Sequence, residues 1–83
     1  MLVYIVSMTK IPKNDHRIQN KAIEISNLAV FSDGKIAREY VQKEILKLNP
    51  NSWYPSKSGN VFYASKDSLT YEYAIEVFPV KDF

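Results

Sequence analysis

The chain has 83 residues, of which 46% are hydrophobic and 13% aromatic, and a formal net charge of +2. This length predicts a single domain over residues 1–83, because a second core would have too little chain to enclose it. The absence of cysteine excludes disulfides and thiolate–metal sites. The apolar N-terminal run is too short for a membrane span and lacks the features of a leader, so we expect a cytoplasmic protein.

The first predicted element is a strand over Leu2–Thr9, where apolar side chains occupy both faces of a two-residue period. Such a strand is typical of a central position in a sheet. Lys10–Asn20 follows as a long loop, since Pro12 and the turn-forming pair Asn14–Asp15 interrupt the pattern. Extra loop length often serves function, and the basic character of the chain is concentrated here.

The second predicted strand covers Lys21–Phe31. Ile23 and Ile25 share one parity, whereas Leu28 and Val30 share the other. A β-bulge near Ser26–Asn27 would return all four to the core face, because an extra residue resets the alternation.

A helix is predicted within Phe31–Pro50, the one segment with both a start and a stop signal. Ser32 or Asp33 can cap its first turn, Asn49 can adopt the left-handed conformation after it, and Pro50 cannot continue it. Its apolar positions recur at three- and four-residue spacings and form one predicted stripe: Ile36, Ala37, Tyr40, Val41, Ile45 and Leu48.

Asn51–Gly59, which contains Pro55 and the only tryptophan, is predicted to be a loop. Asn60–Ser65 and Leu69–Val80 are predicted to form a β-hairpin around Lys66–Ser68. In the last strand an alternating pattern indicates one buried and one wet face, and Pro79 indicates an edge or a strand end.

The predicted order is β-β-α-β-β, an α+β fold with an antiparallel sheet and one helix packed on one of its faces. One helix covers one face only. The second face carries tyrosine and β-branched side chains, so a partner or a second copy is expected to cover it.

No motif in the sequence specifies a reaction. His16 is the only histidine, and no spacing supplies it with a nucleophile. Glu72 and Glu76 are four residues apart on one strand, about 13 Å, which is too far to act on one bond. Asp33-Gly34-Lys35 lacks the glycines of a phosphate-binding loop. We therefore predict a protein that is not an enzyme and that uses no metal or cofactor.

Basic residues recur every three to four positions in and after the first loop, and they predict a candidate nucleic-acid-binding surface: Lys10, Lys13, Arg17 and Lys21. Tyrosines on the predicted strands could stack unpaired bases beside it: Tyr4, Tyr63, Tyr71 and Tyr73. The alternative is a solubilising loop with these tyrosines in the core.

Trp53, Tyr54 and Lys57 form the second candidate, a surface for a protein partner. Exposed tryptophan and tyrosine dominate the binding energy of many protein interfaces. The alternative is that Trp53 folds back over the helix end near Leu48 and closes the core.

Val30-Phe31-Ser32, then Ala37, Tyr40 and Val41, and finally Tyr73, Ile75 and Phe78 follow the patterns VFS, A-x-x-Y-V and Y-x-I-x-x-F. The run resembles small phage and bacterial accessory proteins of unassigned function. The resemblance implies a fold and a phage-accessory or regulatory setting, and it transfers no catalytic residue. Proteins of this kind often look like inhibitors of host nucleases or toxins.

Three functional hypotheses follow. The first is a non-enzymatic protein that inhibits or regulates a protein partner, such as a phage-encoded antagonist of a host defence nuclease or toxin in the host cytoplasm. The second is an accessory protein that binds RNA or single-stranded nucleic acid. The third is a structural homodimer. None of the three requires a membrane.

Overall fold

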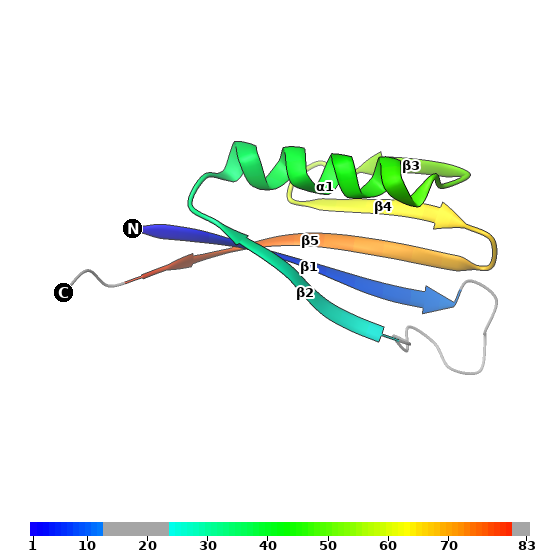
Figure 1. Cartoon of the computed structure of the whole chain (residues 1–83), viewed down its shortest axis with the longest axis horizontal. Helices are drawn as coiled ribbons and strands as arrows, with labels where there is room; N and C mark the ends of the chain where they lie inside the picture. Colours follow the sequence, from blue (N-terminus) through cyan, green and yellow to red (C-terminus); the bar gives the residue numbers. More distant parts are fainter. Residues whose placement is uncertain (13–23, 81–83) are drawn as a thin grey trace.

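One antiparallel sheet and one helix make up the part of the chain that the computed structural model describes, residues 1–12 and 24–80 (Figure 1). The sheet has five strands in the order β2-β1-β5-β4-β3. This arrangement confirms the predicted α+β class and adds one strand to it. The elements are β1 (Leu2–Pro12), β2 (Glu24–Phe31), α1 (Gly34–Leu48), β3 (Ser52–Pro55), β4 (Val61–Lys66) and β5 (Leu69–Pro79).

Helix α1 begins and ends where the capping signals predict. The Lys35 backbone N–H donates to Asp33 Oδ1 at 2.8 Å, which satisfies one of the amides that no preceding turn can pair. Asn49 adopts the left-handed conformation (φ 54°, ψ 60°), and its N–H donates to the carbonyls of Ile45 and Leu46. Lys66 Nζ donates to the Leu48 carbonyl at 2.7 Å, so a side chain from β4 also caps the helix end.

The apolar stripe of α1 packs on the sheet with one correction. Ala37, Val41 and Ile45 are 0% exposed, and Tyr40 and Leu48 pack against the core. Ile36 belongs to the predicted stripe, but the structure leaves it 50% exposed. It precedes Ala37 by one position and therefore points about 100° away from it around the helix axis.

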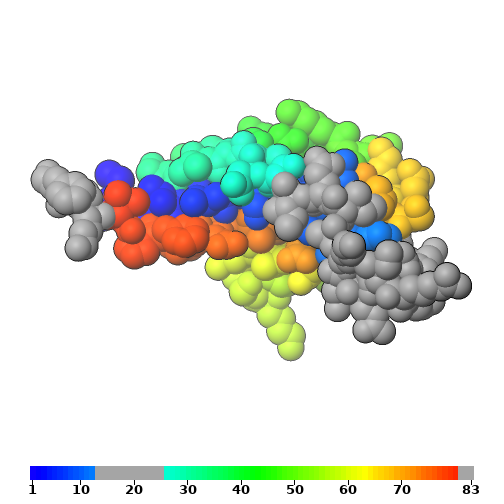
Figure 2. Space-filling model, turned by 90° about the horizontal axis from the view of Figure 1, so that it is seen from below, coloured from blue at the N-terminus to red at the C-terminus, as the bar shows by residue number. Residues whose placement is uncertain are grey.

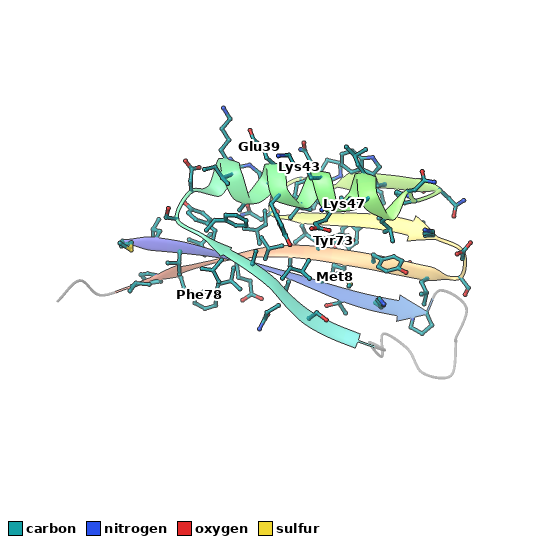
Figure 3. All side chains as sticks on the ribbon, in the orientation of Figure 1. Met8, Glu39, Lys43, Lys47, Tyr73 and Phe78 are labelled. Atoms are coloured by element: carbon teal, nitrogen blue, oxygen red, sulfur yellow. The ribbon has the colours of Figure 1, made fainter. Side chains whose placement is uncertain are left out.

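The sheet supplies the other half of the core through residues that share the helix side. Val6 of β1 pairs with Ile75 of β5, and Tyr73 of β5 pairs with Phe62 of β4. All four side chains, together with Ala64, are buried. Figure 3 shows Tyr73 and Met8 beneath the helix.

Strand β1 is longer than predicted and lies between β2 and β5, which confirms that it is not an edge. It continues through Lys10 to Pro12, so the segment predicted to be a loop from Lys10 begins as strand. The predicted bulge in β2 is present: the register shifts where Val6 pairs with Ala29 and Ser7 with Asn27.

Leu28 is the extra residue of this bulge, and it packs against the core as predicted. Val30 does not. It pairs with Ile5 on the side of the sheet away from the helix and is 62% exposed, so its predicted core position is wrong. Ile23 and the side chain of Ile25 lie outside the described residues.

The segment 51–59 is not a loop throughout, since residues 52–55 form the edge strand β3, which pairs with β4. The turn that follows is closed by the Ser56 N–H, which donates to the Val61 carbonyl at 2.7 Å, and Gly59 takes a positive φ of 75°. Pro79 lies at the end of β5, as predicted.

Candidate protein-binding face

The side of the sheet away from α1 has no covering element among the described residues, and we call it the open face. Pairing in the sheet puts alternate residues of all five strands on this side. In Figure 2 the helix lies along one side of β1 and β5, and the β3–β4 turn projects on the opposite side. The open face comprises Val3, Ile5, Ser7, Thr9, Ile11, Asn27, Val30, Ser52, Tyr54, Val61, Tyr63, Ser65, Thr70, Glu72, Ala74, Glu76 and Phe78.

One end of the open face is an apolar patch. Val3 of β1 pairs with Phe78 of β5, and Ile5 of β1 pairs with Val30 of β2. Phe78 is 43% exposed and Val30 is 62% exposed. A contiguous exposed group of large apolar side chains is typical of an interaction surface, whereas single exposed residues need no explanation.

The paired ends of β1 and β5 extend this patch beyond the helix, and Figure 1 shows them passing the start of α1. Residues 1–3 and 77–80 form this terminal ribbon, which the Val80 N–H closes by donating to the Met1 carbonyl at 2.8 Å. Leu2 and Val77 point to the helix side and are still 48% and 41% exposed. Both faces of the ribbon are therefore accessible and apolar.

The other end of the open face is aromatic and acidic. Tyr54 of β3 pairs with Tyr63 of β4, and their ring centroids lie 5.2 Å apart with 33° between the planes. Tyr63 pairs in turn with Glu72 of β5. Glu76 is on the same side of β5, four residues further, where it pairs with Ile5 and borders the apolar patch. No side chain in the described ranges forms an ion pair with either carboxylate.

The predicted partner-binding residues do not share one surface. Trp53 points to the helix side of β3, where the centroid of its ring lies 6.4 Å from the ring centroid of the buried Phe62. It is 41% exposed, so it packs on the rim of the core and keeps part of its ring in solvent. Tyr54 points to the open face and is 60% exposed. Lys57 is exposed in the β3–β4 turn.

Of the predicted nucleic-acid-binding residues, the structure describes one. Lys10 lies in β1 rather than in a loop, with its ammonium group 5.9 Å from the centroid of the Tyr71 ring. Lys13, Arg17 and Lys21 lie outside the described residues, as does His16.

Three of the four tyrosines considered for base stacking face the helix. Tyr4 and Tyr71 are half-buried against the core, and Tyr73 is 4% exposed. Burial raises the pKa of the Tyr73 hydroxyl, and the carboxylate of Glu44 raises it further. Tyr63 alone of the four lies on the open face.

The segment weighed in the sequence as a phosphate-binding loop has a structural role instead. Asp33-Gly34-Lys35 is the start of α1, and its carboxylate caps the helix. Over the described ranges, no three His, Cys, Asp or Glu side chains gather as a metal site would require. The single helix there is too short and too polar to cross a membrane.

The row Tyr54–Tyr63–Glu72 is the part of this face that sequence reasoning missed. The sequence predicts a loop over Asn51–Gly59, which includes β3, and a loop gives Tyr54 no strand partner to place it beside Tyr63. The signal was the Trp53-Tyr54 pair, since aromatic residues favour strands. Its neighbours Pro50 and Pro55 concealed it.

Comparisons with models of protein families, with curated proteins and with solved structures find no match. The resemblance to phage and bacterial accessory proteins therefore stays a prediction.

Proposed function

We propose that this chain is a small non-enzymatic protein that regulates or inhibits a protein partner, which it binds through the open face and the adjoining terminal ribbon. The observation that carries the proposal is a sheet face that no described element covers, on which Val30, Tyr54 and Phe78 are exposed by 62%, 60% and 43%. Burying such side chains against a partner is favourable, at about 25 cal/mol per Å² of apolar surface.

The composition of the face supports a protein ligand more than a nucleic acid. Its described strand positions carry the carboxylates of Glu72 and Glu76 and no lysine or arginine. These negative charges would repel phosphates, whereas proteins that bind nucleic acids depend on basic side chains to neutralise them. Large apolar and tyrosine side chains beside a polar row are typical of protein interfaces.

The test compares substitutions on the two sides of the molecule. Val30→Ser and Phe78→Ser remove exposed apolar groups from the open face, whereas Leu46→Ser removes one from the outer side of α1, where Leu46 is 71% exposed. Affinity capture from a host lysate, with and without RNase, followed by mass spectrometry, measures which proteins each variant retains.

We expect a protein that wild type and Leu46→Ser retain, that both open-face variants lose, and that RNase leaves bound. Equal retention by all variants would refute the open face as the binding surface. Loss on RNase treatment would favour the RNA alternative. A molar mass that doubles with concentration in light scattering, in wild type but not in Phe78→Ser, would identify the face as a homodimer interface instead.

A further inference from the structure

The open face carries two kinds of surface in a fixed order along β5. Three larger side chains on one side of this strand are those of Glu72, Glu76 and Phe78, which are separated by even numbers of residues and therefore point the same way. At about 3.3 Å per residue, the strand positions of the two carboxylates are about 13 Å apart and Phe78 lies about 7 Å beyond Glu76. A ligand that lies along β5 therefore meets acid, acid and aromatic ring in that sequence.

The first carboxylate has an aromatic wall beside it. Tyr63 lies directly across from Glu72, at a distance of about 5 Å between Cβ atoms. Tyr54 extends the wall by one strand, since its ring centroid is 5.2 Å from that of Tyr63. The faces of tyrosine rings attract cations, and a carboxylate at the edge of the wall adds a charge-assisted hydrogen bond.

These carboxylates have no internal counter-charge in the described chain. The two lysines of the described strands, Lys10 and Lys66, point to the helix side, where they contact the Tyr71 ring and the Leu48 carbonyl. A second copy of this chain, docked face to face, would bring four carboxylates together. A basic ligand would instead complement both of them.

We propose that the open face binds a basic peptide segment of a protein partner, in extended conformation along β5. An arginine or lysine of the segment lies over Tyr54 and Tyr63 beside Glu72. A second basic residue, four positions further, pairs with Glu76. An apolar residue two positions beyond that packs on Phe78. This inference rests on the proposed function and names the chemistry of the partner.

Arginine suits the first position best, because its planar guanidinium stacks on tyrosine rings and forms bidentate hydrogen bonds with a carboxylate. The four-residue spacing follows from matching two extended chains, since residues i and i+4 of a strand point the same way. The segment therefore reads basic, basic, apolar at positions 1, 5 and 7.

Selection from a displayed library of random peptides tests this proposal without knowledge of the partner. Wild type is expected to enrich peptides with arginine or lysine four positions apart. These peptides should bind Glu72→Gln/Glu76→Gln about tenfold more weakly, because both cationic contacts lose their carboxylate. Glu39→Gln, on the outer side of α1 (Figure 3), is the matched control and should bind them like wild type.

Failure of this inference and failure of the proposed function look different. Enriched peptides that are apolar and uncharged, and that Phe78→Ser loses but Glu72→Gln/Glu76→Gln keeps, would overturn the basic ligand and retain the docking face. Basic peptides that bind wild type, Glu72→Gln/Glu76→Gln and Glu39→Gln equally, or a selection without enrichment, would also overturn the proposal. Loss of binding in Tyr54→Ala/Tyr63→Ala, with folding unchanged by circular dichroism, supports it.

Discussion

Two isoleucines of α1 test how the helix sits on the sheet. Ile45 is 0% exposed and Ile36 is 50% exposed. Nine positions separate them, which at 100° per residue puts them on opposite sides of the helix. Ile45→Ala removes three buried carbon groups, at about 0.8 kcal/mol each, and leaves a cavity, so the free energy of unfolding should fall by about 3 kcal/mol. Ile36→Ala should change it by less than about 0.5 kcal/mol.

The loss of free energy of unfolding expected for Ile45→Ala is large for this chain. At roughly 0.05–0.15 kcal/mol per residue, a domain of this size has a free energy of unfolding of about 4–12 kcal/mol. Since 1 kcal/mol shifts the melting temperature of such a domain by about 6 °C, Ile45→Ala should lower Tm by about 18 °C. Thermal melts followed by circular dichroism measure both variants. Similar Tm values for Ile36→Ala and Ile45→Ala would refute the packing described above.

Three further predictions concern the helix caps and the buried tyrosine. Asp33→Ala removes the acceptor for the Lys35 N–H and should lower stability by about 1 kcal/mol in urea unfolding, whereas Asp33→Ser should restore most of it. Asn49→Val should destabilise by about 1 kcal/mol or more and Asn49→Gly by at most a few tenths, because the backbone is left-handed there; a loss of the same size in both would contradict this. The pKa of Tyr73 is raised above its ordinary value of 10.0 in the folded state, so the fold favours its neutral form. Its contribution to stability is present below about pH 10 and is lost as pH rises through the folded pKa, and Tyr73→Phe should reduce this alkaline decline in Tm measured against pH.

The helix and its caps could be predicted from local sequence because the signals are local. Asp33, Asn49 and the Ala37–Val41–Ile45 spacing each act within one or two turns of the same element. The error at Ile36 has a local cause too. A hydrophobic residue at the border of a stripe looks the same in a sequence whether it faces the core or solvent.

The sheet order and the edge strand could not be predicted in the same way. β3 has four residues, and it is a strand because β4 lies beside it, a property of the tertiary fold. The Tyr54–Tyr63–Glu72 row depends on three strands in register, so no single segment contains its signal. Leu28 and Val30 share a parity in the sequence, but Leu28 is the extra residue of the bulge. Leu28 therefore packs on the core while Val30 faces the other side of the sheet.

The pairing of β1 with β5 has a consequence for how the chain folds. The closest residues in sequence across this pair, Pro12 and Leu69, are about 57 positions apart, and the most distant, Leu2 and Pro79, are about 77 apart. The β4–β5 hairpin can form from its own neighbours, but β1 and β5 can meet only after most of the polypeptide has been drawn together. Closing so large a loop costs chain entropy before any of its contacts form. The centre of this sheet is therefore its slowest part to assemble, and a circularised chain that tethers the ends of β1 and β5 would start with that entropy already lost.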